Sequence, residues 1–277
     1  MYGLYSPYGG RLSKIYWSLF TKIKLIRVLT AVKEENLVFP YRLIKTLTGE
    51  NTLLAFNMGS PGVEQKISML GWDESNQQPF FAKFSQKTAA RSLTKNEINV
   101  YRILKETGLT PRLLKSENSG EYDFIMTEYV EGKRPKDRFM NEKVLELAIK
   151  LSSFHLDNMG HNGELLTCLS HGDFCPWNIL VKNDRWNLID WEVAAERPLG
   201  FDLFTYICQV AALFEPEKPL SQAIAENRSY IDRYFGALSA GDWTKYLVSF
   251  VEEKVNYEAS KGNDDLLKKY KELQYET

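Results

Sequence analysis

Two short segments in the middle of the chain constrain its fold most strongly. The first reads HGDFCPWN over residues 171–178, and the second reads IDWE over residues 189–192. Between them, two apolar runs separated by a polar turn predict a short β-hairpin over residues 179–189. The ring of Pro176 fixes its own φ angle and so restricts the first segment to few conformations. Because a hairpin returns the chain to its starting point, we expect the second segment to lie beside the first.

The polar residues of these segments have the spacing of a phosphoryl-transfer site. In kinases an aspartate orients or deprotonates the acceptor hydroxyl, and an asparagine five residues later binds Mg²⁺. A second aspartate, after the next strand, binds the metal ions that bridge the ATP phosphates. Asp173, Asn178 and Asp190 stand at these offsets. Each alone is compatible with a solvated side chain in a turn, but with the hairpin they form one consistent structural context. They predict a catalytic base at Asp173 and metal ligands at Asn178 and Asp190.

The motif HGDxxPxN followed by IDWE resembles the aminoglycoside phosphotransferase and choline kinase-like family, whose members share the protein-kinase-like fold. Gly172 stands where the protein-kinase loop has arginine. Trp191 and Glu192 follow Asp190 where protein kinases have phenylalanine and glycine. Both differences favour a small-molecule kinase over a protein kinase.

The resemblance also implies two supporting residues around the catalytic loop. His171 resembles the family histidine that supports the loop. Asp202 resembles the later aspartate of the family, which braces the loop from the start of a helix. An ordinary helix N-cap is the other interpretation of Asp202, and it is compatible with the first.

A nucleotide-binding half should precede the catalytic loop. Lys83 lies in an apolar, aromatic strand predicted over residues 78–85, where a lysine is costly unless it is paired. We predict that Lys83 binds the α- and β-phosphates, braced by Glu97 of the following helix. The alternatives are an edge-strand lysine that reaches solvent and, for Glu97, a capping box with Thr94.

Two further segments resemble parts of the family's nucleotide site. Strands predicted over residues 51–58 and 66–70 flank a turn that contains Ser60, a candidate phosphate contact, although Ser-Pro-Gly is equally typical of a plain type II turn. Residues 122–132 read as a strand that ends at a glycine, and they resemble the hinge between the two lobes. The residues expected to hydrogen-bond adenine through their backbone are Glu128, Tyr129 and Val130.

Composition excludes some classes of protein. The chain has 277 residues and a net charge of −1, so nothing indicates a nucleic-acid partner. Its cysteines form neither a disulfide framework nor a metal-ligand pattern, which favours the reducing cytoplasm. Cys175 lies inside the catalytic loop, where we expect a solvent-accessible thiol without a catalytic role. The other two cysteines are Cys168 and Cys208.

The first 45 residues lie outside the family resemblance and are rich in aromatic residues. Residues 1–33 contain no acidic residue. Charges interrupt every apolar run, so no transmembrane helix is expected here. We favour a helical extension that docks on the small lobe over a basic helix that contacts a membrane surface. The basic residues are Arg11, Lys14, Lys22, Lys24, Arg27 and Lys33.

The order of predicted elements, strands first and helices afterwards, indicates an α+β fold. We expect the bilobal protein-kinase-like architecture, with a small β-rich N-lobe and a mainly helical C-lobe. The predicted domains are the extension 1–45, the nucleotide-binding N-lobe 46–131 and the C-lobe 132–277. The predicted helices of the C-lobe cover residues 141–155, 203–214, 222–238 and 243–260.

The sequence therefore predicts an ATP-dependent phosphotransferase that uses Mg²⁺, with GTP as the alternative nucleotide. The acceptor is the hydroxyl group of a small molecule that resembles an aminoglycoside, choline or a sugar. In relatives it lies between the catalytic loop and the C-terminal helices. The acceptor-site candidates are Trp191, Glu192 and Glu196. Aromatic and acidic residues of the last predicted helix would suit a cationic acceptor, and a sugar hydroxyl is equally compatible.

The alternative from a different class is a silent pseudokinase or scaffold that docks to a partner or membrane through its basic N-terminus.

Overall fold

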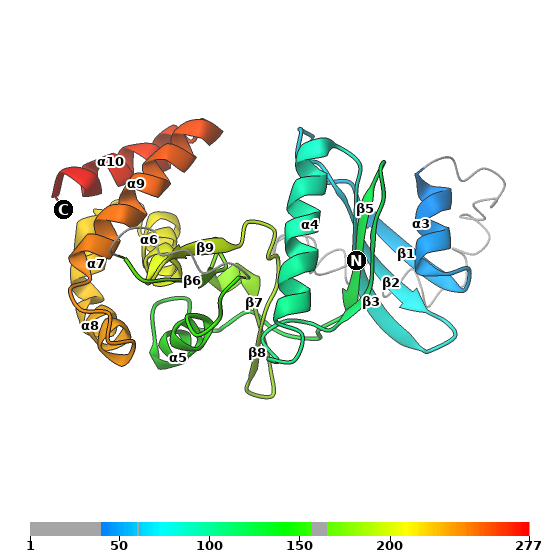
Figure 1. The fold of residues 1–277 in the computed structure, drawn as a ribbon, viewed down its shortest axis with the longest axis horizontal. Helices are drawn as coiled ribbons and strands as arrows, with labels where there is room; N and C mark the ends of the chain where they lie inside the picture. The colour runs from blue at the N-terminus through cyan, green and yellow to red at the C-terminus, as the bar shows by residue number, and fades with distance from the viewer. Residues whose placement is uncertain (1–39, 60, 157–164, 277) are drawn as a thin grey trace, which may run out of the picture. The chain divides into compact units, whose positions relative to one another are not determined.

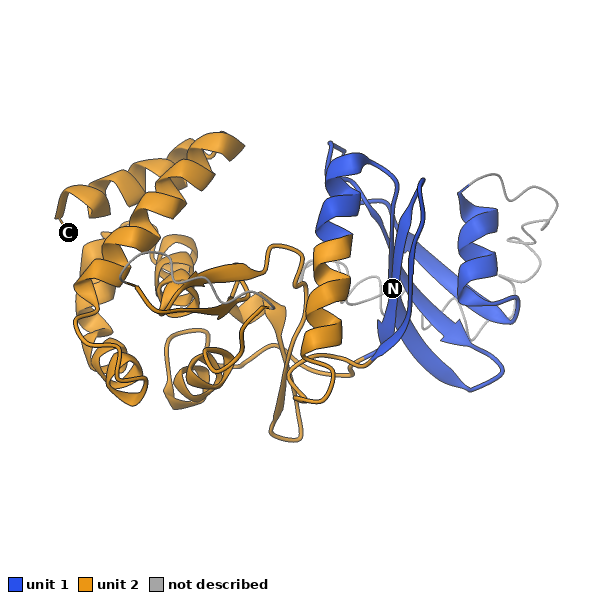
Figure 2. Cartoon of the chain, in the orientation of Figure 1, with its two compact units in different colours: residues 1–94, 113–129 blue, residues 95–112, 130–277 orange. Residues whose placement is uncertain are grey.

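The structure is a computed structural model that describes residues 40–59, 61–156 and 165–276 (Figure 1). Ser60 and nearly all of the predicted N-terminal extension therefore lie outside the described residues. The chain divides into two compact units (Figure 2). The first unit contains Met1–Thr94 and Leu113–Tyr129, and the second contains Lys95–Arg112 and Val130–Thr277. The domain boundaries expected from the sequence stay predictions.

The first unit is built on an antiparallel five-stranded sheet with the order β1-β2-β3-β5-β4. Helix α3 (Tyr41–Thr48) packs against this sheet through Ile44 and Leu47, which join a core with Met69 and Phe84. The strands are β1 (Thr52–Asn57), β2 (Ile67–Asp73), β3 (Gln78–Ser85), β4 (Leu113–Asn118) and β5 (Asp123–Glu128). The strands expected around residues 51–58, 66–70, 78–85 and 122–132 are thus confirmed within a few residues.

Helix α4 (Thr88–Ile103) contributes its first residues to the first unit and its last to the second. Thr94 lies in the middle of this helix, and its hydroxyl group hydrogen-bonds the hydroxyl group of Ser85. A capping box requires its threonine just before the first helical turn. The capping-box interpretation of Thr94 and Glu97 is therefore wrong.

The second unit surrounds two small antiparallel β-pairs with helices. Strand β6 (Thr167–Ser170) pairs with β9 (Ala195–Pro198), and β7 (Ile179–Lys182) pairs with β8 (Arg185–Leu188). The β7-β8 pair confirms the hairpin expected between the two motif segments. Its turn residues Asn183 and Asp184 have φ angles of 47° and 60°, the left-handed geometry that two-residue hairpins require. The hairpin thus places Asp190 just after β8.

Helices dominate the rest of the second unit (Figure 1). Asn141 caps α5 by accepting hydrogen bonds from the backbone N–H groups of Lys143 and Val144. The helix expected over residues 222–238 is two helices, because Asn227 leaves helical geometry. The helices are α5 (Glu142–Leu151), α6 (Phe201–Phe214), α7 (Leu220–Glu226), α8 (Arg228–Ala237), α9 (Thr244–Lys261) and α10 (Asp264–Glu276).

The two units together confirm the α+β fold class, with strands concentrated in the first unit and helices in the second. The sequence did not predict the last helix, α10. Helix α10 packs against α9, and α9 covers one face of α10. Within the described part of the chain, no helix is long and apolar enough to cross a membrane.

Gly71 in β2 offers a test of the packing in the first unit. Phe80 of β3 lies directly opposite, and its ring covers the glycine so closely that a Cβ atom would stand 2.0 Å from it. Phe80 is only 3% exposed and belongs to the core, so its ring has little room to move. We expect Gly71→Ala to lower the free energy of unfolding by about 1–3 kcal/mol, the typical cost of overpacking. The measurement is the midpoint of urea unfolding.

Gly120→Ala is the matched control in the same unit, because a Cβ atom there would meet nothing within 4 Å. It should change the midpoint of urea unfolding no more than ordinary surface substitutions do. Equal effects of the two substitutions would contradict the packing of Phe80 on Gly71.

Candidate active site

The catalytic loop between β6 and β7 is held by one buried carboxylate. Asp202, in the first turn of α6, accepts hydrogen bonds from the backbone N–H groups of His171 at 2.7 Å and Gly172 at 3.0 Å. It also accepts one from the hydroxyl group of Ser170 at 2.8 Å. Gly200 occupies the N-cap position of α6, so the N-cap interpretation of Asp202 is wrong. The carboxylate binds the loop rather than the end of its own helix.

His171 connects the loop to the strand that precedes Asp190. Its Nε2 lies 3.0 Å from the carbonyl oxygen of Ile189 and therefore donates the hydrogen bond. Its Nδ1 then accepts from the backbone N–H of Asp173 at 3.3 Å. The imidazole ring packs on the indole of Trp191, with ring centroids 4.5 Å apart. His171 thus joins the two motif segments from behind the loop.

Gly172 is the residue that separates this loop from that of protein kinases. Its φ angle is +81°, where residues with a side chain are strained. A Cβ atom would also stand 2.5 Å from the carbonyl oxygen of Val193 and 2.8 Å from a guanidinium nitrogen of Arg197. An arginine does not fit at this position, so the glycine is required by the local packing.

Asn178 fixes the orientation of the Asp173 carboxylate. Its Nδ2 donates to the Asp173 carbonyl oxygen at 2.9 Å and to the carboxylate Oδ2 at 2.7 Å. The short helix Pro176–Asn178 places the amide for this contact, with Pro176 in its first turn. The amide oxygen Oδ1 accepts no hydrogen bond from the described residues. It therefore keeps both lone pairs for another ligand.

Cys175 lies beside Asp173 but is completely buried. Burial raises the pKa of its thiol well above the usual value, and the nearby Asp173 carboxylate raises it further. A thiol with a raised pKa and no solvent exposure is chemically inert. The expectation of an accessible thiol in the catalytic loop is wrong.

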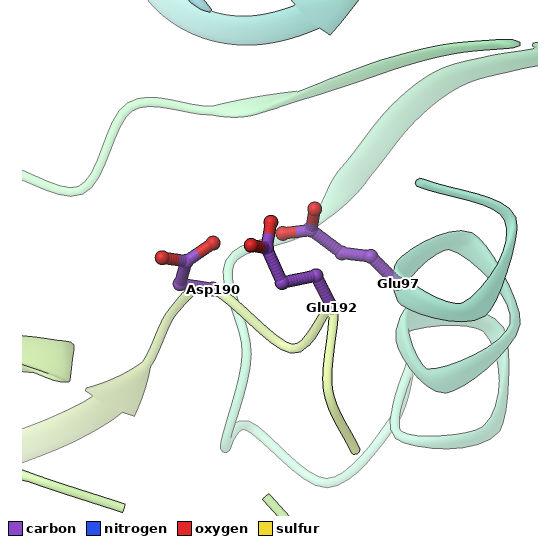
Figure 3. A group of neighbouring side chains, drawn as sticks. All are labelled: Glu97, Asp190 and Glu192. Atoms are coloured by element: carbon purple, nitrogen blue, oxygen red, sulfur yellow. The ribbon is translucent and has the colours of Figure 1, made fainter. Parts of the chain in front are cut away.

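Three carboxylates meet where β8 ends. Oxygen atoms of Glu97, Asp190 and Glu192 all lie within 4.8 Å of one another, and Figure 3 shows the three side chains converging. Asn96 supports this arrangement by donating from Nδ2 to the carbonyl oxygens of Glu192 at 3.0 Å and Ala194 at 2.7 Å. Like charges this close repel, and clustered carboxylate oxygens are the donors that hard divalent cations prefer.

Asp190 itself is held in an uncommon conformation, with a φ angle of +70°. Aspartate tolerates the left-handed region better than most residues, and outliers of this kind concentrate at functional sites. The same carboxylate charges act on the buried side chain of Tyr101 in α4. Burial raises the pKa of its hydroxyl well above the usual value, and the carboxylates of Glu97 and Asp190 add to the rise.

The predicted partners Lys83 and Glu97 lie in different compact units, and their pairing stays a prediction. Lys83 is only 7% exposed, and β3 is the middle strand of the sheet. The alternative of an edge-strand lysine in solvent is therefore wrong. Sequence reasoning did not anticipate that Glu97 would also lie beside Asp190 and Glu192.

The predicted hinge residues follow β5 directly. Glu128 is the last residue of this strand, and the side chain of Tyr129 is exposed. The carbonyl oxygen of Val130 accepts a hydrogen bond from the backbone N–H of Gly132 at 2.9 Å. Contact of these residues with adenine stays a prediction.

The structure separates the candidate acceptor residues. Trp191 is fully buried, and its indole N–H donates to the carbonyl oxygen of Leu188 at 3.0 Å, so its assignment to the acceptor site is wrong. Glu196 accepts hydrogen bonds from the backbone N–H of Leu156 at 3.1 Å and the hydroxyl group of Thr167 at 2.8 Å. Contact of Glu196 with the acceptor stays a prediction.

A cavity of about 360 Å³ opens beside the catalytic loop within the second unit. Its wall includes Asp173, Asp190 and Glu192. Helix α9 contributes another part of the wall, including Lys254 and Tyr257. Lys254 was not among the predicted site residues. The signal that could have found it is its place on the apolar stripe of α9, in step with the buried Phe250 and Val251.

Comparison with known proteins gives a family match for part of the chain and a likeness of fold. Residues 142–245 match the model of the phosphotransferase enzyme family. A search of curated proteins gave no match. Amicoumacin kinase hAmiN, solved in complex with AMP-PNP, Ca²⁺ and Ami, is similar in structure. It has a TM-score of 0.53 and 10% sequence identity over 87% of this chain and 94% of that chain.

The aminoglycoside-3′-phosphotransferase of type VIII has a TM-score of 0.49 and 15% identity over 83% of this chain and 97% of that chain. The matched segment 142–245 contains the catalytic loop, the hairpin and Asp202. The family match and the likeness to hAmiN confirm that the chain resembles the aminoglycoside phosphotransferase and choline kinase-like family and has the protein-kinase-like fold.

Proposed function

We propose that the protein is a kinase that transfers the γ-phosphoryl group of ATP to a hydroxyl group of a small molecule. One observation carries the proposal: the carboxylate of Asp173, oriented by Asn178, lines the same cavity as the carboxylates of Asp190 and Glu192. A base and a set of metal-binding oxygens around one cavity are the parts that phosphoryl transfer requires.

In the proposed reaction the acceptor oxygen forms a bond to the γ-phosphorus. The bond between that phosphorus and the β,γ-bridging oxygen breaks, and ADP leaves. The proton of the acceptor hydroxyl passes to the carboxylate of Asp173. Asn178 donates to one oxygen of this carboxylate and so would hold it in position for the proton transfer.

The donor set suits Mg²⁺, which takes oxygen ligands in octahedral geometry. Asn178 would contribute Oδ1, and Asp190 and Glu192 would contribute carboxylate oxygens. Bound there, Mg²⁺ supplies positive charge to the β- and γ-phosphates. The complex of hAmiN with AMP-PNP and Ca²⁺ supports a nucleotide and a divalent cation as ligands of this fold.

The nucleotide would be held by the residues that the sequence predicts for it. Lys83 would bind the α- and β-phosphates with Glu97 as its brace, and backbone groups of Glu128, Tyr129 and Val130 would hydrogen-bond the base. GTP is the alternative to ATP. The catalytically silent scaffold is less well supported, because the base and every predicted metal-ligand position are filled by residues able to act.

Replacement of Asp173 by asparagine tests the catalytic base. Asparagine keeps the size and still accepts a hydrogen bond from Asn178, but it cannot take the hydroxyl proton. We expect Asp173→Asn to lower kcat by at least about 10²-fold, the usual contribution of a positioned base. Turnover is measured as ADP release with a panel of hydroxyl metabolites.

Asp184→Asn is the matched control, because Asp184 is an exposed turn residue with a positive φ angle that asparagine also adopts. It should keep the wild-type kcat. Wild-type turnover in folded Asp173→Asn would refute the assignment. Mg²⁺-dependent binding of ATP without turnover on any acceptor would favour the scaffold instead.

The carboxylate cluster makes a second test available, because it offers the oxygen ligands that a divalent cation prefers. Asp190→Asn removes one of these charged ligands. The rise in Tm on adding ATP should then need at least about tenfold more Mg²⁺, a loss of about 1.4 kcal/mol. Thermal unfolding across a Mg²⁺ titration measures this requirement, with Asp184→Asn again as the control. An unchanged Mg²⁺ requirement would remove Asp190 from the metal site.

A further inference from the structure

The cavity beside Asp173 contains a buried cation that the proposed reaction does not use. Lys254 of α9 is only 5% exposed, yet it lines the cavity together with Asp173. Its small exposed surface therefore belongs to the cavity. A lysine is rarely buried to this degree unless an anion compensates its charge.

No carboxylate of the described residues forms a direct ion pair with Lys254. Its Nζ lies 5.0 Å from the ring centroid of Phe201, 5.8 Å from that of Phe250 and 5.9 Å from that of Tyr257. Among the described residues its ammonium group makes no hydrogen bond and no ion pair within 4 Å. Burial lowers the pKa of Lys254, and the nearby Arg197 lowers it further, while Cys175, Asp173 and Glu258 oppose the shift. Cation–π contacts offset only part of the lost hydration.

The acidic residues near Lys254 have other partners. Glu253 forms an ion pair with Arg197 at 2.6 Å. Glu258, one turn further along α9, accepts a hydrogen bond from Asn263 at 3.0 Å. The carboxylate of Asp173 is bound by Asn178. The N–H donors of the lysine are thus left for a ligand in the cavity.

We propose that Lys254 binds an anionic group of the acceptor, a carboxylate or a phosphate, so that the phosphorylated hydroxyl belongs to an acidic small molecule. This inference rests on the proposed kinase function of the same cavity. It also argues against a cationic acceptor. The aromatic faces of Phe201 and Tyr257 already contact the ammonium group, and a second cation there would be repelled.

The test uses sets of related polyols whose members carry no charge, a carboxylate or a phosphate. Glycerol, glycerate and glycerol 3-phosphate form one matched set, and glucose, gluconate and glucose 6-phosphate form another; choline is the cationic probe. Thermal unfolding of the full chain is followed at equal ionic strength with saturating AMP-PNP and Mg²⁺, so that anions cannot occupy the nucleotide site. In the wild type, we expect the Tm to rise with at least one anionic member of a set and not with its neutral member. Comparison of the carboxylate probes with the phosphate probes shows which anion the protein prefers.

Lys254→Met removes the charge and keeps an unbranched side chain that is one heavy atom shorter. It should raise the half-saturating concentration of the effective anion at least about tenfold, or about 1.4 kcal/mol. Lys245→Met, an exposed lysine of the same helix outside the cavity, is the control and should respond like the wild type. Without ligand, the Tm of Lys254→Met should equal or exceed that of the wild type, because an apolar group replaces a buried, uncompensated charge.

Several results would overturn the inference. They are an equal response to neutral and anionic probes, a preference for choline, no response to any anion, or an unchanged anion response in Lys254→Met. The change in Tm caused by AMP-PNP and Mg²⁺ is measured first, without acceptor probes. Failure of that step contradicts the proposed kinase function, whereas its success followed by failure of the anions contradicts only the role of Lys254.

Discussion

The carboxylate of Asp202 determines the geometry on which the rest of the site depends. It binds the backbone of His171 and Gly172 directly, and so fixes the positive φ angle that only glycine adopts without strain at residue 172. That turn directs Asp173 into the cavity instead of along the path of β6. Charge-assisted hydrogen bonds of this kind are stronger than neutral ones, particularly where the carboxylate is buried. A rigid backbone at Asp173, the proposed base, is what a reaction that depends on positioning requires.

Charge is distributed unevenly within the cavity that this loop helps to form. The carboxylate oxygens of Asp190 and Glu192 lie within 4.8 Å of one another. In the proposed reaction they would repel a bare triphosphate and favour one that arrives with a divalent cation. The ammonium group of Lys254 is buried in the same region and forms no ion pair within 4 Å with the described residues. Such arrangements are typical of functional sites, where groups are arranged for a ligand instead of for the fold.

The parts of the structure that depend on local chemistry could be predicted from the sequence. The hairpin between the two motifs follows from apolar runs around Asn183 and Asp184, and the start of α5 follows from the side chain of Asn141. The predictions that failed concern features that depend on contacts between segments distant in the sequence. Nothing near Trp191 in the sequence reveals that His171 covers its ring. The position of Glu97 beside Asp190 likewise depends on how α4 packs against the end of β8.

Two buried lysines illustrate two ways of identifying a functional residue, by its place in a motif and by the energetic cost of its buried charge. Lys83 was recognised because a kinase strand is expected to carry a lysine for the phosphates, and its burial in β3 is compatible with that role. Lys254 was not recognised, because no family pattern calls attention to a lysine in a helix near the C-terminus. The same physical rule applies to both, since a buried ammonium group requires a matching anion. Applied to α9, where Lys254 interrupts an apolar stripe, that rule identifies the side of the cavity at which the acceptor's own charge is expected.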